Sequence, residues 1–497
     1  MKSFSKILVA NRGEIAIRIM RACREMDIES VAVYSEIDRT AKHVRYSDEA
    51  FCIGPAPSTD SYLRIDSIVK TALESGCQAV HPGYGFLAEN PALPAACRDA
   101  GITFIGPSAE SMALLGNKTQ ARRMAVQANI PVVPGTTDPI SDVKEAENVV
   151  EKMGLPVLLK AAGGGGGKGV RIVRDAAQLH SNLEQATAEA AASFNNPDIY
   201  IEKYLERPRH VEIQIMADHH GNVVHMAERE CSVQRRFQKL IEEAPSCALD
   251  EELRQKMGET AKRAILASDY HNAGTVEFLL DSSGNFYFCE VNARLQVEHP
   301  VTELVTGVDI VKEQIMIAQG YPLSFSQEDI HFNGAAIECR ICAEDPVTFF
   351  PSTGTITELE EPSGPGVRLD SGISEGYKVS LYYDPLIAKL LVWGKDRNEA
   401  LARMQRALSE YRIKGIHTTI PFHLKALENE SFRTGQYDTG IVQEIEHPKT
   451  DINIDVAVIA AAIVAGEDIA VELGGMSEKS RWKLLGRVGN GLRRSKW

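Results

Sequence analysis

The sequence predicts a multidomain α/β and α+β protein that begins with a doubly wound parallel sheet. Its 497 residues suffice for about three domains of roughly 150 residues each, and 44% of them are hydrophobic. Up to about residue 115, short apolar runs alternate with amphipathic stretches such as 14–26. This alternation is typical of βαβ units, which place parallel strands in one sheet.

The composition narrows the class of protein. The 54 Lys and Arg residues against 68 Asp and Glu residues give a net charge of −14. A chain with this charge balance does not have the basic surface expected of a nucleic-acid-binding protein. Nine scattered cysteines fit a reducing compartment better than a disulfide framework. The longest apolar run, 456–465, is about half the ~20 residues that span a bilayer, and no secretory signal pattern is present. We expect a cytoplasmic protein that binds neither nucleic acid nor membrane.

The first domain, 1–115, has predicted strands at 6–10, 30–35, 79–82 and 103–106. Its first strand-to-helix turn, residues 11–14, contains one glycine and not the G-x-G-x-x-G of a dinucleotide-binding turn. An NAD-dependent oxidoreductase is therefore disfavoured.

The second predicted domain, 116–333, begins with a helix at 118–133 that Pro131 and Pro134 end. A small α+β lid at about 133–204 follows, with strands 156–160, 170–173 and 199–205 and a helix at 176–192. The rest of the domain has a strand at 210–216, a helix at 251–268 and a hairpin of strands 276–281 and 286–291.

The third predicted domain, 334–446, has strands at 335–341, 355–359 and 386–393 and a helix at 398–411. Residues 447–497 differ in kind, because an alanine-rich helical pattern gives way to a basic stretch at 473–497. We expect a helical basic tail that is either solvated or docks an acidic partner.

A run of five glycines, 163–167, is the strongest local signal. Glycines allow close backbone approach, so that successive N–H groups cradle phosphate oxygens, and Lys168 adds a point charge. Ala162 and Gly169 break the Walker A pattern, and a strand follows where a dinucleotide motif requires a helix. We interpret the run as a phosphate-binding lid; a flexible hairpin tip is the alternative.

Two glutamates face each other in the predicted hairpin. If Ser283 and Gly284 form a two-residue loop, Glu277 lies opposite Glu290 with Cβ atoms roughly 5 Å apart. Opposed like charges destabilise a sheet unless both face water or share a cation. A divalent cation would remove this repulsion.

Polar side chains alternate after this point. Every second residue of an extended chain faces one side, which here holds Glu290, Asn292, Arg294, Gln296 and Glu298. With the opposed glutamate, the set provides oxygen ligands for magnesium, a guanidinium for an anion and a base. A magnesium and phosphate site is predicted; an ordinary solvated strand face is the alternative.

Seven segments carry a wider pattern: ANRGEIAIRI (10–19), HPGYGFLAEN (81–90), KAAGGGGGKG (160–169), EKYLERPRHVE (202–212), CSVQRRFQK (231–239), CEVNARLQVEHPVTE (289–303) and ECRICAEDP (338–346). Together they resemble the biotin carboxylases of the ATP-grasp superfamily, over about residues 1–446. The resemblance implies an N-terminal pre-ATP-grasp domain, an ATP-grasp domain with a glycine-rich lid, and a C-terminal biotin carboxylase domain.

The resemblance also implies site residues. The nucleotide contacts would be Lys118, Lys160, Gly165, Gly166 and Lys168 at the phosphates, Glu202, Lys203 and Leu205 near the adenine, and His210 and Gln234 at the ribose. The ligands of Mg²⁺ or Mn²⁺ would be Glu277, Glu290 and Asn292. Bicarbonate would be positioned by Lys239, Arg294, Gln296 and Val297, with Glu298 as the base and Arg340 facing biotin.

The implied reaction is the ATP-dependent carboxylation of biotin by bicarbonate through carboxyphosphate, which gives carboxybiotin, ADP and phosphate. Bicarbonate is a weak nucleophile, so a carboxylate must remove its proton while cations take up the developing charge. No Met-Lys-Met of a biotinyl turn occurs in the sequence. We therefore expect a biotin carboxyl carrier protein and a carboxyltransferase on separate chains, and the resemblance implies a homodimer.

Other interpretations stay open. A different ATP-grasp ligase and a non-catalytic nucleotide-binding regulatory protein both fit the lid and the glutamates. The downstream acceptor, whether acetyl-CoA, another acyl-CoA or pyruvate, is also open.

Three positions raise separate questions. Phe237 and Lys168 depart from the histidine and arginine common in the family. Cys339 and Cys342 form a C-x-x-C, but residues three apart in an extended segment point to opposite faces, which disfavours a zinc or redox site.

Overall fold

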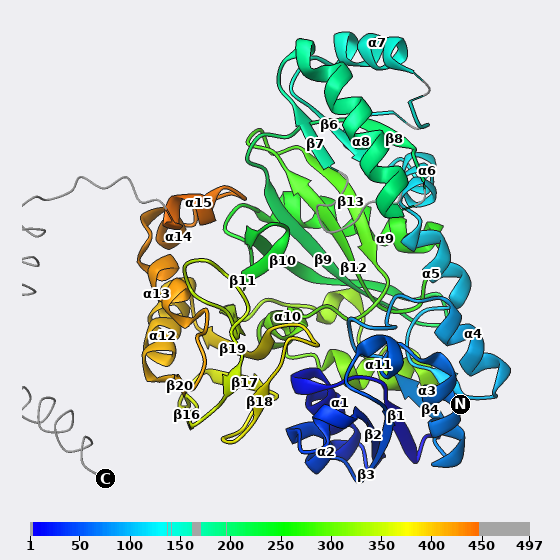
Figure 1. The fold of residues 1–497 in the computed structure, drawn as a ribbon, viewed down its shortest axis with the longest axis vertical. Helices are drawn as coiled ribbons and strands as arrows, with labels where there is room; N and C mark the ends of the chain where they lie inside the picture. Colours follow the sequence, from blue (N-terminus) through cyan, green and yellow to red (C-terminus); the bar gives the residue numbers. More distant parts are fainter. Residues whose placement is uncertain (1–2, 137, 141, 162–169, 195, 447–497) are drawn as a thin grey trace, which may run out of the picture. The chain divides into compact units, whose positions relative to one another are not determined.

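The computed structural model describes residues 3–136, 138–140, 142–161, 170–194 and 196–446. The chain opens with strands β1 (Lys6–Val9), β2 (Glu29–Ser35), β3 (Glu49–Gly54), β4 (Ala79–His81) and β5 (Thr103–Phe104). They form one parallel sheet of order β3-β2-β1-β4-β5 (Figure 1). The first strand is central and the chain extends the sheet on both sides, so the predicted doubly wound sheet is confirmed.

Helices connect these strands and lead out of the sheet. They are α1 (Gly13–Glu25), α2 (Lys42–Tyr46), α3 (Ile65–Glu74), α4 (Ala92–Asp99), α5 (Ala109–Gly116) and α6 (Lys118–Gln127), with 3₁₀ turns η1 (Glu36–Asp38) and η2 (Ser58–Asp60). The helix predicted over 118–133 is shorter than expected. Asn129 adopts a left-handed conformation, with φ of 54°, and this ends the helix before the prolines are reached.

The predicted lid is a separate α+β unit. Strands β6 (Val157–Ala161), β7 (Val170–Val173) and β8 (Ile199–Lys203) form an antiparallel sheet of order β7-β6-β8. Helices α7 (Val143–Met153) and α8 (Leu179–Phe194), with η3 (Ala176–Gln178), accompany it (Figure 1). Apolar residues such as Val150, Leu159 and Leu183 form a core of its own. Residues 162–169, and with them Gly165, Gly166 and Lys168, lie outside the described part of the chain.

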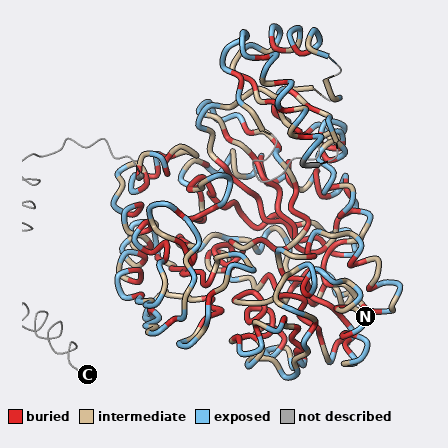
Figure 2. The backbone as a smooth tube through the Cα atoms, viewed as in Figure 1, coloured by how far each residue is buried: buried red, intermediate tan, exposed pale blue. Residues whose placement is uncertain are grey.

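An eight-stranded antiparallel sheet carries most of the predicted site. Its strands are β9 (Arg209–Ala217), β10 (Val223–Arg235), β11 (Gln238–Ala244), β12 (Asn272–Leu280), β13 (Phe286–Asn292), β14 (Ala335–Cys342), β17 (Val367–Ser371) and β19 (Leu386–Gly394). The order is β13-β12-β9-β10-β11-β14-β19-β17, and its central strands are buried (Figure 2). The pairing of β11 with β14 carries the sheet across 333/334, and the domain boundary there stays a prediction.

Further elements complete the described chain. The helices are α9 (Glu251–Ala267), α10 (His299–Thr306), α11 (Ile310–Gln319), α12 (Arg397–Glu410), α13 (Ile420–Glu428), α14 (Glu430–Thr434) and α15 (Ile441–Glu446), with the turn η4 (Gln327–Asp329). Two short antiparallel pairs are β15 (Gly354–Thr355) with β18 (Lys378–Val379), and β16 (Glu358–Glu360) with β20 (Arg412–Lys414).

The single strand predicted at 355–359 is wrong. β15 and β16 pair with different partners, and between them Ile356 is fully buried. The backbone N–H of Ile356 donates to Tyr377, whereas that of Thr357 donates to Lys414, so the chain changes sheets at this point.

The β12–β13 hairpin contains a bulge. A two-residue loop was expected, but the backbone N–H of Asp281 donates to Asn285 and leaves a three-residue loop at 282–284. Phe278 therefore pairs with Phe288, and a register shift follows before the next pair, Glu277 with Glu290. Cys289 is the extra residue. The predicted pairing of the two glutamates is confirmed although the predicted loop is wrong.

Two further predictions concern the C-terminal tail and the absence of a membrane-spanning helix. The predicted tail, 447–497, lies outside the described residues. Within the described part, no helix combines the length and the apolar character needed to cross a membrane.

Candidate active site

Lys239 is the centre of a buried charge cluster on the eight-stranded sheet. Its Nζ donates hydrogen bonds to three carboxylates: Glu212 (2.5 Å), Glu277 (3.0 Å) and Glu298 (2.5 Å). These side chains are almost fully buried, so the ammonium compensates negative charge that has little water around it. Burial favours the neutral amine, but the surrounding carboxylates raise the pKa of Lys239 well above its ordinary value.

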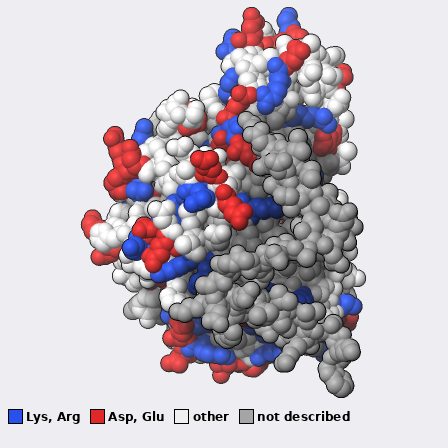
Figure 3. All heavy atoms as spheres, turned by 90° about the vertical axis from the view of Figure 1, so that its left-hand side faces the viewer, with Lys and Arg blue, Asp and Glu red and all other residues white. Residues whose placement is uncertain are grey.

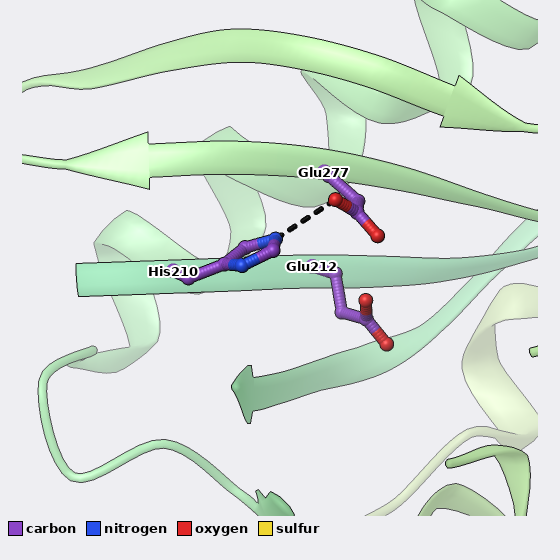
Figure 4. Close-up of side chains that lie close together, drawn as sticks. All are labelled: His210, Glu212 and Glu277. Atoms are coloured by element: carbon purple, nitrogen blue, oxygen red, sulfur yellow. Dashed lines mark hydrogen bonds and ion pairs between the residues drawn. The ribbon is translucent and has the colours of Figure 1, made fainter. Parts of the chain in front are cut away.

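His210 and Glu277 form a contact on neighbouring strands. Figure 4 shows the imidazole of His210, on β9, directed at Glu277 on β12, with Glu212 two residues further along β9. His210 Nε2 lies 2.9 Å from Glu277 Oε2, and Gln234 Nε2 lies 3.3 Å from His210 Nδ1. The two predicted ribose residues are thus brought together beside a predicted metal ligand. Burial lowers the pKa of His210, but the charge of Glu277 outweighs it and raises the value overall.

The predicted metal ligands lie on paired strands. Glu277 and Glu290 are directly opposite, and Asn292 on β13 donates from Nδ2 to Glu277 Oε1 at 2.9 Å. Glu290 is partly exposed and lies 3.7 Å from Lys118. Burial opposes ionisation of Glu277, but Lys239 and His210 lower its pKa, so it is a carboxylate. Two opposed carboxylates with one open to solvent fit a hard cation that prefers oxygen ligands.

The segment after β13 is not extended as expected. The strand ends at Asn292, and Glu298 is the residue before α10. The polar side chains still converge, because Arg294 donates to Asn292 Oδ1 (3.0 Å) and Gln296 Oε1 (2.9 Å). Gln296 in turn donates to Glu277 at 3.1 Å. The alternation along a strand is therefore replaced by hydrogen bonds within a loop.

Glu298 lies between two cations. One carboxylate oxygen accepts from Lys239, and the other accepts from Arg340 NH2 at 2.9 Å. Burial alone would favour the protonated acid, but Lys239, Arg340 and Arg229 hold the pKa of Glu298 well below its ordinary range. Glu298 is therefore ionised and able to accept a proton.

The nucleotide residues on the lid lie together. Lys160 on β6 forms a 2.8 Å ion pair with Glu202 on β8, and Arg122 on α6 reaches the same carboxylate at 3.3 Å. Lys203 Nζ instead donates to the backbone carbonyls of Gly154 and Leu155. Leu205 is the second residue after Lys203, just beyond the end of β8.

Four charged residues of the site were not identified from the sequence. Glu212 and Arg229 pair with each other at 2.5 Å inside the sheet, Glu242 binds Arg340 at 2.6 Å, and Glu89 from the N-terminal region binds Arg294 at 3.1 Å. Each is a charged residue whose contact with the site depends on which strands or loops become neighbours in the fold. Glu212 and Glu89 lie within the quoted motifs, so the signal was present without a role attached to it.

Phe237 lies in a tight turn at the edge of the site. Arg236 and Phe237, both with positive φ (50° and 65°), join β10 to β11, and Phe237 is 66% exposed.

Cys339 and Cys342 are buried and free. The described charged side chains on the face in Figure 3 are interspersed in sign.

Three family models match consecutive parts of the chain. Residues 3–112 match the family "Biotin carboxylase, N-terminal domain", residues 117–326 match "Carbamoyl-phosphate synthase L chain, ATP binding domain", and residues 338–444 match "Biotin carboxylase C-terminal domain". These matches follow the same order as the three domains expected from the sequence.

Whole-chain relatives extend the likeness. Biotin carboxylase 1 of Bacillus subtilis is 53% identical over 440 residues, which cover 88% of this chain and 98% of the relative. The biotin carboxylase of a Nostoc species is 52% identical over 443 residues, which cover 89% of this chain and 99% of the relative. A solved structure is similar with a TM-score of 0.86 and 48% identity, covering 90% of this chain and 100% of that one. It is a dimer of the biotin carboxylase domain of Hydrogenobacter thermophilus 2-oxoglutarate carboxylase with MgADP, ADP and bicarbonate.

Proposed function

Because this chain belongs to the biotin carboxylase family, we propose that it carboxylates biotin with ATP and bicarbonate, giving carboxybiotin, ADP and phosphate. This is the first half-reaction of a biotin-dependent carboxylase. The observation that carries the proposal is the placement of an ionised, buried carboxylate, Glu298, between Lys239 and Arg340.

The chain's own residues supply the acid–base chemistry. Glu298 removes the proton of bicarbonate as its oxygen attacks the γ-phosphorus of ATP. Lys239, Arg294 and Gln296 hold the bicarbonate next to that base. When bound to Glu277, Glu290 and Asn292, Mg²⁺ would neutralise charge on the phosphates. These assignments are supported by the hydrogen bonds that connect six of these seven side chains in one cluster, with Glu290 directly opposite Glu277 at its exposed edge.

Arg340 serves the second step. Carboxyphosphate breaks down to carbon dioxide and phosphate, and the phosphate takes the proton of the biotin ureido nitrogen. The guanidinium stabilises the enolate-like oxygen that results. Its pairing with Glu298 and Glu242 supports this role, because both carboxylates fix the plane of the guanidinium.

The remaining site assignments concern the nucleotide. Lys118, Lys160, Gly165, Gly166 and Lys168 contact the phosphates, Glu202, Lys203 and Leu205 lie near the adenine, and His210 and Gln234 reach the ribose. The ion pair between Lys160 and Glu202 supports a single nucleotide pocket at the lid. Val297 completes the bicarbonate contacts.

The partners follow from the substrate. Biotin reaches this enzyme on a carrier protein, and a carboxyltransferase uses the product; these 497 residues contain no Met-Lys-Met. The enzyme is a homodimer, as the similar Hydrogenobacter domain is. Covalent biotin on this chain after expression with a biotin ligase would refute the first statement, and a monomeric mass in solution would refute the second.

The deciding experiment is the release of ADP measured with and without bicarbonate and free biotin. We expect ADP release that requires bicarbonate and is increased by biotin. Another ATP-grasp ligase would need a different co-substrate, and a regulatory protein would bind ATP without bicarbonate-dependent hydrolysis. Either result would overturn the proposal.

A further inference from the structure

Lys389 is a fully buried lysine that the reaction described above does not use. It lies on β19, and its Nζ donates a 2.8 Å hydrogen bond to the backbone carbonyl of Val297. Val297 directly precedes the base Glu298. The lysine thus contacts the backbone of the segment that holds bicarbonate, without reaching the reacting atoms.

The second partner of Lys389 comes from the first helix of the chain. Glu14, in the first turn of α1, lies 3.3 Å from Nζ, and both side chains are almost completely buried. Neither Glu14 oxygen accepts a hydrogen bond from the described residues, so the ion pair with Lys389 is its main compensation. One ammonium therefore joins three regions: α1, the segment before α10, and β19.

The position of Lys389 within the sheet places it beside a second cation of the site. Lys389 pairs directly with Arg340 on β14, so two cations lie side by side on one face. Opposed like charges destabilise a sheet, and Asp370, directly opposite Lys389 on β17, offsets this repulsion. The two cations hold two consecutive residues: Arg340 binds the side chain of Glu298, and Lys389 binds the carbonyl of Val297.

Other charged groups surround this pair. Glu338 on β14, Asp370 on β17 and His299 on α10 all face Lys389 closely enough to interact electrostatically. The approach of α1 is close, because a Cβ added to Gly372 would lie 2.8 Å from the backbone nitrogen of Glu14. The Glu14 carboxylate therefore has little freedom to leave the ammonium.

We propose that Lys389, held by Glu14, is a positioning residue that fixes the Val297 carbonyl and thereby the orientation of Glu298 toward bicarbonate. This inference rests on the proposed function. A buried carbonyl that loses its donor must find another partner, so the segment moves and takes the base with it. Small displacements of reacting groups cost large factors in rate.

The test is the kinetics of Lys389→Met, which keeps an unbranched side chain, one atom shorter, but removes the donor. We expect kcat/KM for bicarbonate to fall by at least about tenfold, with KM for ATP changed by less than about twofold. The matched control is Arg254→Met, which breaks a part-buried ion pair with Glu228 at 2.8 Å, away from this segment. It should lower thermal stability without changing the bicarbonate kinetics.

The double variant Glu14→Gln/Lys389→Met separates positioning from folding. It removes both buried charges, so we expect thermal stability to recover relative to Lys389→Met while the bicarbonate defect persists. If Lys389→Met does not fold, the double variant carries the test. Normal bicarbonate kinetics in the double variant, or an equal defect in Arg254→Met, would overturn the positioning role. Absence of bicarbonate-dependent ADP release in the unmodified enzyme would instead overturn the proposed function.

Discussion

Four pairs of glutamates are directly opposite each other across the described antiparallel strands, and two of these pairs differ in their electrostatic surroundings. Glu277 and Glu290 are opposed on β12 and β13, and Glu242 and Glu338 are opposed on β11 and β14. In the first pair, Lys239 and amide donors reach Glu277, and Glu290 is partly exposed. In the second pair both residues are completely buried, and neither Glu338 oxygen accepts a hydrogen bond from the described chain.

The difference teaches that opposed carboxylates do not by themselves define a metal site. Lys239 and His210 lower the pKa of Glu277 despite its burial. Burial raises the pKa of Glu242 to about 7 and that of Glu338 well above its ordinary value. Donors and access to solvent decide whether a pair attracts a cation or retains a proton. Glu298 connects the two pairs, through Lys239 on one side and Arg340 on the other.

Replacing this connecting residue should have the largest effect. Glu298→Gln preserves shape but cannot accept a proton, so we expect bicarbonate-dependent turnover to fall by roughly 100-fold or more. Equilibrium binding of ATP, measured alongside, should be retained. Near-normal turnover would mean that Glu298 is not the base.

Magnesium titrations should distinguish the two pairs. Glu290→Gln leaves the metal with less compensating charge, so we expect the Mg²⁺ concentration for half-maximal activity to rise by about tenfold. Glu338→Gln is the matched control, because Glu338 belongs to the fully buried pair with Glu242. This substitution should leave the magnesium requirement unchanged. An unchanged requirement in Glu290→Gln would remove Glu290 from the ligands.

The fully buried pair of Glu242 and Glu338 should affect how the stability of the folded protein depends on pH. The folded state retains the proton of Glu338 above the ordinary carboxyl pKa, whereas the unfolded state releases it, so this group makes stability fall as pH rises. Glu338→Gln removes the effect. As pH rises above the ordinary carboxyl pKa, we expect the stability of this variant relative to the unmodified enzyme to increase, followed by thermal unfolding. A pH-independent difference would contradict a protonated Glu338.

The smallest effect is expected at Phe237, in the turn before the strand that carries Lys239 and Glu242. Histidine tolerates the left-handed conformation of this position, so Phe237→His should fold normally. We expect the apparent affinity for ATP to change more than kcat, because the turn follows Gln234, which we propose contacts the ribose and not the γ-phosphate. Kinetics at saturating ATP provide the measurement, and a large fall in kcat there would refute this placement.

Much of the fold was predictable because periodicity is local. The parallel sheet, the lid elements and the opposition of Glu277 and Glu290 all follow from patterns within a few residues. The contacts of Glu89 and Glu242 were not predictable, since they depend on which distant strands and loops become neighbours. The loop from Arg294 to Glu298 was misjudged because hydrogen bonds override alternation once a strand ends.

The bulge at Cys289 makes the site depend on chain length more than on the identity of that residue. Phe286 and Phe288 belong to the apolar core, and by simple alternation Glu290 and Asn292 would point there as well. The extra residue turns them to the opposite face. Substitutions of the exposed Cys289 should therefore be accommodated, whereas its deletion would bring two polar side chains into the core and leave Glu277 without its counterpart.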